Sequence, residues 1–166
     1  MGLFDSFKKN AKQDNFDGIL KAYATGSVVP MKDVDDETFS QEILGPGVAI
    51  EPSEGCIYAP CDGEASLIAD TKHAISISAP NDAELLIHIG LDTVELNGDG
   101  FTPHVSVGDK VKTGDKLVSF DMELIKDKGY KVTTPIIVCN HDDYKTIEPI
   151  ASGEINVGED LLKVEK

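Results

Sequence analysis

Two histidines, His73 and His88, are the residues of this chain whose type and spacing favour shared chemistry. His73 lies in the run KHAISISA (residues 72–79), and His88 lies in the run ELLIHIG (residues 84–90). A pair of neutral imidazoles can bind a metal ion, shuttle a proton, or let one nitrogen attack phosphorus while the other stabilises the charge. A single histidine in an apolar strand is more often a buried structural residue, so the case for an active site depends on the pairing.

The segments that carry the two histidines are predicted to form one β-hairpin. Residues 72–79 alternate between polar and apolar positions, residues 85–89 are apolar, and the intervening Pro80-Asn81-Asp82-Ala83 has turn composition. A loop with an even number of residues would place both imidazoles on one face of the sheet, whereas an odd loop would separate them. We expect an even loop, which puts the two Cβ atoms about 5 Å apart for a two-residue loop or about 7 Å apart for a four-residue loop.

The charge balance excludes one large class of partner. The 166 residues carry a formal charge of −15, which repels nucleic acid and favours a basic protein partner. All 15 basic residues are lysines, so no arginine is present to grip a phosphate in a bidentate fork. A phosphoryl-transfer reaction on this chain therefore needs cationic groups from outside.

The three cysteines, Cys56, Cys61 and Cys139, favour a reducing compartment. Their number is odd, they include no C-x-x-C pair, and the chain has no secretory segment and no run of 18 apolar residues. We therefore expect a cytoplasmic location. The length favours a single domain with one core.

The first residues differ in character from the remainder of the chain. Residues 1–13 place Leu3, Phe4 and Phe7 at helical spacing with three flanking lysines, which predicts a short amphipathic helix. We assign residues 1–18 to an N-terminal arm and residues 19–166 to the main domain. The arm either contacts a membrane surface or a partner through residues 1–13, or it is a frayed or packed terminus.

From Ala22 onward the pattern is that of an all-β protein. Short apolar stretches are interrupted every 8 to 12 residues by Gly, Pro, Asn and Asp. A faint repeat relates residues 22–26 to residues 59–63, and a second relates the Gly-Asp turns of residues 105–120 to residues 155–165. We expect a compact antiparallel β-sandwich or barrel built from duplicated hairpin units, with a short N-terminal amphipathic helix.

Four other segments carry local predictions. The acidic run of residues 32–42 is predicted to be a solvated loop that exposes Phe39 to a basic partner. Residues 122–130 are predicted to form one or two helical turns, and residues 133–140 a strand whose Pro135 marks a sheet edge or the start of the strand. His104 and His141 are expected to be exposed and to have no catalytic role.

Several of these motifs together resemble one family, the glucose-type enzyme IIA of the bacterial sugar phosphotransferase system. The motifs are T-K-H-A-I at residues 71–75, E-L-L-I-H-I-G-L-D-T-V at residues 84–94 and V-G-D-K-V-K-T-G-D-K-L at residues 107–117, with a spacing of fifteen positions from one histidine to the other. The resemblance runs from about Ile19 almost to the C-terminus, and it implies a β-sandwich with a duplicated hybrid motif that serves as a phosphocarrier.

The resemblance also implies a role for each site residue. The histidine matching His88 accepts a phosphoryl group from phosphorylated HPr and passes it to a cysteine of the IIB domain of a glucose-type sugar permease. The histidine matching His73 supports the transfer, the threonine matching Thr71 contacts that histidine, and the aspartate matching Asp92 borders the docking surface. We add Phe39 and Val94 as partner-binding candidates, and the resemblance implies a zinc site at His73 and His88 in some complexes.

Three alternatives remain open at this point. His88-Ile-Gly-Leu-Asp92 spells an H-x-x-x-D pair of the kind found in zinc hydrolases, but the required H-x-H is absent from the sequence. The Gly-Asp turns resemble biotinyl or lipoyl carriers, although Met31-Lys32 is the only approach to their modified lysine. The third alternative is a non-catalytic interaction module of the same fold.

Overall fold

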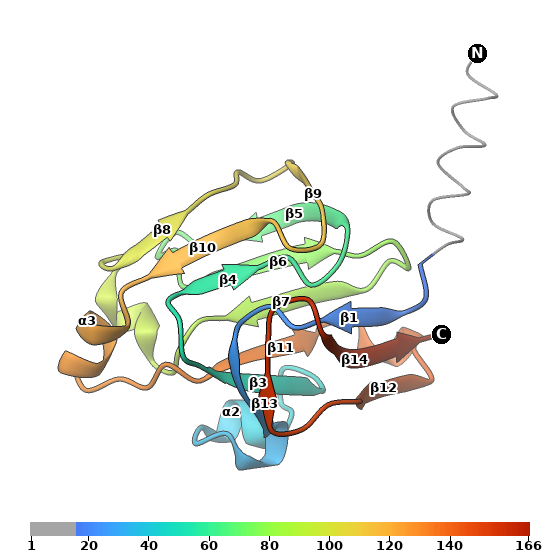
Figure 1. Ribbon diagram of the computed structural model, residues 1–166, viewed down its shortest axis with the longest axis horizontal. Helices are drawn as coiled ribbons and strands as arrows, with labels where there is room; N and C mark the ends of the chain where they lie inside the picture. The colour runs from blue at the N-terminus through green and yellow to red at the C-terminus, as the bar shows by residue number, and fades with distance from the viewer. Residues whose placement is uncertain (1–15) are drawn as a thin grey trace.

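The apolar run around His88 forms strand β7, which lies inside the largest sheet of the molecule (Figure 1). The computed structural model describes residues 16–166. The large sheet has eight antiparallel strands in the order β13-β2-β3-β11-β7-β6-β5-β9. Their bounds are Glu154–Ile155, Gly26–Pro30, Gly47–Pro52, Thr134–Val138, Glu84–His88, Ala74–Ser78, Gly63–Ile68 and Lys110–Val111.

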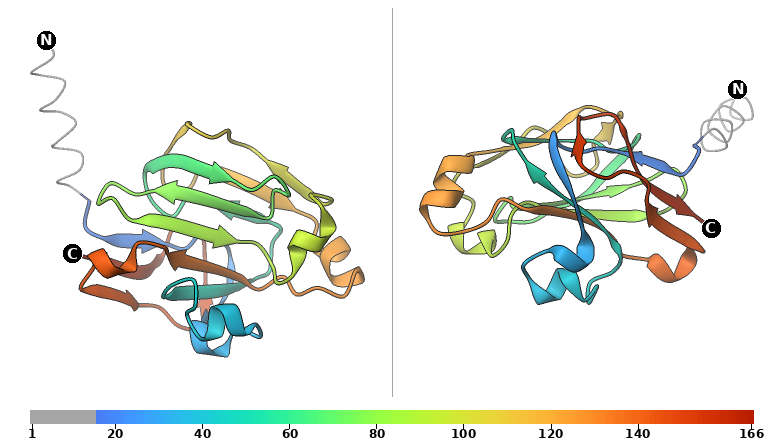
Figure 2. Two further views of the ribbon diagram at one scale, coloured as in Figure 1. Left: turned by 180° about the vertical axis from the view of Figure 1, so that it is seen from behind. Right: turned by 60° about the horizontal axis from the view of Figure 1, so that its bottom comes forward.

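Two three-stranded antiparallel sheets complete the sandwich, as the two views of Figure 2 show. One has the order β4-β10-β8, with bounds Cys56–Tyr58, Lys116–Phe120 and Phe101–Pro103. The other has the order β1-β14-β12, with bounds Ile19–Lys21, Asp160–Glu165 and Thr146–Pro149. Among residues 16–166 the structure therefore confirms the all-β class and the antiparallel sandwich, whereas the N-terminal helix predicted over residues 1–13 lies outside the described residues.

The predicted duplication is visible in the strand pairing. In one half β1 pairs with β14 and β2 with β13; in the other β4 pairs with β10 and β5 with β9. The two small-residue turns make equivalent hydrogen bonds: Ala22 N–H donates to Glu159 O at 2.7 Å, and Ala59 N–H donates to Asp115 O at 2.8 Å. The repeat of residues 22–26 and 59–63 is thus a repeat of structure.

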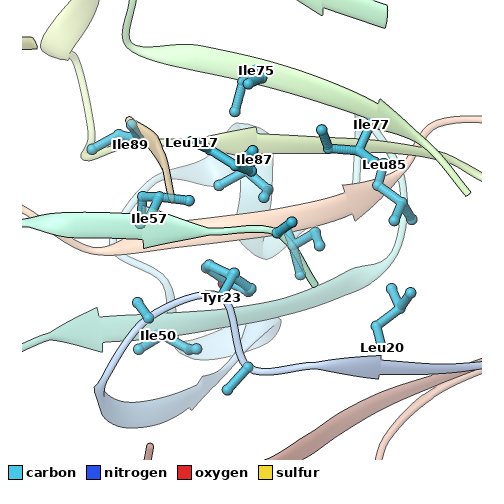
Figure 3. Close-up of a cluster of buried hydrophobic side chains, with 14 of the residues drawn as sticks. Leu20, Tyr23, Ile50, Ile57, Ile75, Ile77, Leu85, Ile87, Ile89 and Leu117 are labelled. Atoms are coloured by element: carbon cyan, nitrogen blue, oxygen red, sulfur yellow. The ribbon is translucent and has the colours of Figure 1, made fainter. Parts of the chain in front are cut away.

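The core lies between the large sheet and the small ones. Figure 3 shows aliphatic side chains from both layers around Tyr23, including Ile57 and Leu117 from the small sheet and Ile87 from the large one. All four side chains are fully buried. Burial of a side chain of this size contributes roughly 1.5–3 kcal/mol, and the buried hydroxyl of Tyr23 donates to the carbonyl of Thr134.

Strand β11 is the central strand of the large sheet, between β3 and β7. Pro135 is its second residue, opposite Ala49, and the pairing with β7 starts one residue later at Ile136. Proline is tolerated there because its missing N–H falls before the ladder to β7 begins. Of the two positions predicted for Pro135, the start of the strand is therefore correct and the sheet edge is wrong.

Short helices connect the strands and cover one part of the sheet's outer face. They are η1 (Met31–Asp33), α2 (Glu37–Ser40), η2 (Thr93–Leu96), α3 (Met122–Asp127) and η3 (His141–Asp143). Helix α3 confirms the helical turns predicted within residues 122–130. Within residues 16–166, no helix is both long and apolar enough to cross a membrane.

The prediction of a solvated loop over residues 32–42 is wrong. Helices η1 and α2 lie in this segment, and Met31, Val34 and Phe39 pack with Leu91 and Ile137 in a second apolar cluster on the outer face of the sheet. Phe39 is only 4% exposed. The acidic residues around it had suggested full exposure, but a four-residue helix can bury one aromatic side chain while its neighbours stay in water.

Candidate functional site

Strands β6 and β7 form the predicted hairpin, but its register differs from the prediction. Ser78 pairs with Glu84 and Ala74 pairs with His88, which leaves five residues between the paired strand ends. The expectation of an even loop is therefore wrong, because Ala79 N–H donates to Ala83 O and makes the loop odd. In a regular ladder this register would place His73 and His88 on opposite faces of the sheet.

The two imidazoles nevertheless meet. Their ring centroids are 4.8 Å apart and their planes are inclined by 81°, an edge-to-face arrangement. His73 lies in a bend immediately before β6, after Lys72, whose φ of 62° is left-handed. Because the extended conformation begins only at Ala74, strand alternation does not set the direction of the His73 side chain. The prediction that the histidines form a pair is thus correct, although the reasoning from register is not.

The ring of His88 is oriented by the backbone that follows it. Its Nδ1 lies 2.8 Å from the carbonyl oxygen of Gly90. Because a carbonyl oxygen can only accept, Nδ1 must carry the proton, and the Nε2 of the neutral ring is left with its lone pair. The nitrogen that a neutral His88 offers for nucleophilic attack is therefore Nε2.

Gly90 is required by the geometry of this turn. Its φ is +76°, and a Cβ at this position would lie 2.7 Å from the carbonyl oxygen of Lys131 and 2.5 Å from Cγ2 of Thr93. Leu91 N–H also donates to the carbonyl of Lys131, at 3.0 Å. Only a residue without a side chain fits between β7 and this neighbouring segment, and sequence reasoning did not identify Gly90 as a site residue.

His73 is held from its other side. Its Nδ1 lies 2.6 Å from Oγ1 of Thr71, so Thr71 contacts His73 as predicted. The hydroxyl of Thr71 can donate to a neutral His73 whose proton is on Nε2. Among residues 16–166, no hydrogen bond is formed by Nε2 of His73 or of His88. Each ring is thus anchored through Nδ1, and each keeps its second nitrogen for chemistry.

The surroundings keep both rings neutral. Burial, with a smaller effect of His88, lowers the pKa of His73 to about 4. Burial also lowers the pKa of His88, although its hydrogen bond to Gly90 and the nearby carboxylates of Asp36 and Asp92 act in the opposite direction. Desolvation disfavours the charged imidazolium, so at neutral pH both histidines are uncharged.

Phe39 is buried and packs against His88, whereas it was predicted to be exposed to a partner. Its ring centroid lies 5.0 Å from that of His88, with a 57° angle between the planes. Asp36, at the start of the same helix, accepts a hydrogen bond from Thr38 N–H at 2.9 Å. Sequence reasoning missed Asp36; the signal available was a capping aspartate two residues before Thr38 and three before Phe39.

The remaining candidates, Asp92 and Val94, follow the turn after β7. Asp92 is exposed, has a φ of 62° and precedes η2, and Val94 in η2 is 45% exposed. Ile43, at 66% exposed, and Leu44 add apolar surface after α2. The partner-binding roles of Asp92, Val94 and Phe39 stay predictions.

The other histidines and the cysteines lie outside the pair. His104 is exposed and contacts the hydroxyl of Ser119, and His141 is paired with its neighbour Asp142. All three cysteines are free thiols, and burial raises the pKa of Cys61 to about 12. Across residues 16–166 no three His, Cys, Asp or Glu side chains gather closely enough to hold a metal ion.

Comparisons with known proteins identify the family of the chain. Residues 18–144 match the family described as phosphoenolpyruvate-dependent sugar phosphotransferase system, EIIA 1. The chain is 44% identical over 160 residues to the PTS system glucose-specific EIIA component of Oceanobacillus iheyensis, covering 96% of this chain and 97% of that one. It is 43% identical over 148 residues to the PTS system beta-glucoside-specific EIIBCA component of Dickeya chrysanthemi, covering 89% of this chain and 24% of that protein.

A solved structure shares the fold. Glucose permease IIA from Mycoplasma capricolum is similar with a TM-score of 0.80 and 35% sequence identity, over 87% of this chain and 93% of that one. The family match spans most of the sequence, including both histidines and the turn after β7. The chain therefore belongs to the EIIA 1 family of the phosphoenolpyruvate-dependent sugar phosphotransferase system.

Proposed function

We propose that this chain is a phosphocarrier that holds the phosphoryl group on Nε2 of His88. The observation that carries this proposal is the hydrogen bond from His88 Nδ1 to the carbonyl of Gly90, which leaves the Nε2 lone pair available. A neutral imidazole is both a good nucleophile and a good leaving group. Reversible transfer of a phosphoryl group needs both properties.

The donor that we propose is phosphorylated HPr. The Nε2 lone pair of His88 attacks the phosphorus atom, a new N–P bond forms, and the N–P bond of the donor breaks with its electron pair returning to the donor nitrogen. No proton needs to leave His88, because the proton of the ring stays on Nδ1 and remains bonded to Gly90. In the second transfer, a cysteine thiolate of a IIB domain attacks the same phosphorus, and His88 recovers its lone pair.

His73 has a different role in this proposal. With Thr71 donating to Nδ1, the proton of His73 lies on Nε2, and this N–H can donate to an oxygen of the phosphoryl group on the adjacent His88. Donors aimed at developing charge in a partly buried site stabilise the transition state. His73 and Thr71 therefore support the transfer without forming a bond to phosphorus.

We propose one docking surface for both partners, an acidic rim made up of Asp36, Ile43, Leu44, Asp92 and Val94. The carboxylates of Asp36 and Asp92 act on His88, and apolar Ile43 and Leu44 after α2 and Val94 in η2 are exposed. A cationic partner suits this acidic rim, because the chain carries a charge of −15 and has no arginine. A IIB acceptor is supported by relatives named EIIBCA components, and the free cysteines suit a reducing cytoplasm.

Zinc binding at the pair is a separate proposal. The Nε2 atoms of His73 and His88 are the two ligands that the chain would supply, and a partner protein would supply the remainder. We therefore expect zinc affinity in a complex and little affinity in the isolated chain. No step of the proposed transfer depends on the metal.

The test compares three histidine variants after incubation with phosphoenolpyruvate, enzyme I and HPr. We expect His88→Gln to take no phosphoryl group, because an amide nitrogen is not a nucleophile. His73→Gln should be phosphorylated but should discharge slowly to a IIB domain, and His104→Gln, outside the pair, should behave as wild type. Intact mass with and without acid treatment measures the acid-labile phosphoryl content.

Each possible failure of this test has a distinct meaning. Phosphorylation of His88→Gln together with loss in His73→Gln would assign the acceptor role to His73. Absence of any phosphoryl group on the folded wild-type chain would favour the non-catalytic interaction module.

A further inference from the structure

Thr93 is buried directly beneath the turn that orients His88. It is 0% exposed, one of only four buried polar residues within 16–166, and it begins helix η2. Its hydroxyl donates to the carbonyl of Ile89, four residues earlier. Its methyl group lies under Gly90, where an added Cβ would come within 2.5 Å of it. A single side chain therefore contacts both residues of the Ile89–Gly90 peptide.

The peptide groups on both sides of this contact are fixed. Ile89 N–H donates to the carbonyl of His73 at 2.7 Å, while Ile89 C=O accepts from Thr93. The Gly90 carbonyl belongs to the next peptide group, whose Leu91 N–H donates to the Lys131 carbonyl at 3.0 Å. The contact of Thr93 with the preceding peptide group and this hydrogen bond together fix the backbone of Gly90, with its φ of +76°, and the direction of the Gly90 carbonyl. That carbonyl is the acceptor for Nδ1 of His88.

From these contacts we infer that Thr93 is a positioning residue that selects the tautomer of His88. The inference rests on the proposed function, in which Nε2 is the nucleophile. Which nitrogen of a neutral imidazole carries the proton is set by the hydrogen bond that the ring makes. Thr93 acts on that choice through the Gly90 carbonyl and does not touch the imidazole.

A merely structural role for Thr93 predicts something different. Removing a buried hydroxyl leaves its acceptor without a hydrogen bond, and this loss destabilises the fold. Such a loss would lower stability without changing the proton position on His88. The position of the imidazole proton therefore separates a positioning role from a structural one.

The experiment compares Thr93→Val with Thr93→Ser. Valine keeps the branched shape and removes the hydroxyl, whereas serine keeps the hydroxyl and removes the methyl group. Tyr144→Phe is the matched control: it removes a buried hydroxyl that donates to the carbonyl of Asn81 at 2.7 Å, at the far end of the same hairpin. Thr93→Ala serves as a second variant without the hydroxyl where Thr93→Val fails to fold.

Two measurements are made on each variant. The first is the nitrogen-15 NMR spectrum of the unphosphorylated imidazoles, which reports the Nδ1–H and Nε2–H tautomers. We expect Nδ1–H alone for His88 in wild type, Thr93→Ser and Tyr144→Phe, and a mixture in Thr93→Val. The second is the rate of phosphoryl acceptance, which should fall about tenfold in Thr93→Val, the lower end of the loss seen when the partner that orients a metal-bound histidine is removed.

The inference is overturned when Thr93→Val keeps the wild-type tautomer, or when Tyr144→Phe shifts it equally. Because the NMR measurement needs no phosphoryl group, it gives an answer even where His88 proves not to be the acceptor. Failure of the proposed function would instead appear in the His88→Gln variant, whose result does not depend on Thr93.

Discussion

The two ends of the β6–β7 hairpin differ in which groups, backbone or side chain, are satisfied by the other. At the tip, side chains satisfy the backbone: Tyr144 OH donates to Asn81 O, Asn140 Nδ2 donates to Asp82 O, and Asn140 Oδ1 accepts from Glu84 N–H. The left-handed Asp82, with φ of 69°, is held within this network. The polar groups of the tip are thus hydrogen-bonded to one another and hold the turn in place.

At the other end of the hairpin, the backbone satisfies a side chain. The carbonyl of Gly90 accepts from His88, and left-handed residues occur at Lys72, Gly90 and Asp92. Thr71 contacts Nδ1 of His73, and both Nε2 atoms are without hydrogen bonds inside the described part of the chain. The difference teaches that a functional end is recognised by which groups remain unused after the backbone has been satisfied.

The largest expected effect comes from Gly90→Ala at the histidine end. The added Cβ would meet the Lys131 carbonyl at 2.7 Å, and the φ of +76° disfavours any side chain. We expect a loss of about 4 kcal/mol in the free energy of unfolding, the sum of the left-handed strain and the overlap, together with loss of phosphoryl acceptance. Urea unfolding and intact mass provide the two measurements.

Gly158→Ala is the control for Gly90→Ala. Gly158 also has a left-handed φ, +92°, but an added Cβ would meet no atom within 4 Å. Its substitution should cost about 1–2 kcal/mol from backbone strain alone and should leave phosphoryl acceptance unchanged. Equal losses in the two variants would mean that the Gly90 turn is no more constrained than an open one.

The next effect is a pH dependence that only the histidine end should produce. The pKa of His73 is about 4 in the folded chain, below its ordinary value of 6.5. Between these values the unfolded chain binds a proton that the folded chain does not, so stability falls as pH is lowered from 6.5 to 4. The contribution is about 3 kcal/mol at most, at 1.36 kcal/mol for each pH unit.

His73→Gln isolates this contribution, because glutamine does not titrate. All other ionisable groups are the same in the two proteins, so their effects largely cancel in the difference. We expect the urea midpoint of His73→Gln to fall less than that of wild type between pH 7 and pH 4.5. Parallel midpoints would show that His73 is protonated as readily in the folded chain as in the unfolded one.

The smallest expected effect lies at the tip. Tyr144→Phe removes the hydrogen bond to Asn81 O, and a single hydrogen bond contributes about 1 kcal/mol net. The free energy of unfolding should fall by about that amount, while the rate of phosphoryl acceptance stays at the wild-type value. A slower rate would mean that the two ends of the hairpin are coupled and that the tip also contributes to phosphoryl acceptance.

The sequence was informative wherever the signal was local and repeated. The alternation of residues 72–79, the turn at residues 80–83 and the echo between Ala22 and Ala59 predicted the hairpin and the duplicated halves. These features depend on strand period and turn chemistry, which neighbouring residues determine. The pairing of His73 with His88 was predicted from an even loop, which the structure contradicts, and the two rings meet because His73 precedes the regular strand.

The features that sequence reasoning missed depend on contacts between distant segments. The composition of a turn does not determine how many residues its loop contains. The Ala79–Ala83 hydrogen bond, which makes this number odd, could therefore not be predicted. Phe39 is buried because α2 packs against Leu91 and Ile137, and a four-residue helix shows no periodicity. Gly90 was overlooked as a site residue because the Lys131 carbonyl that excludes a side chain comes from 41 positions later.

The pairing of β1 with β14 has a consequence for how the chain is made. Ile19 lies opposite Lys163, so the first strand of the described chain is completed by the last, as Figure 1 shows. During translation the ribosome releases Ile19 long before Lys163 emerges. Strand β1 therefore lacks its partner β14 until residues 160–165 have been synthesised, and those residues close the sandwich.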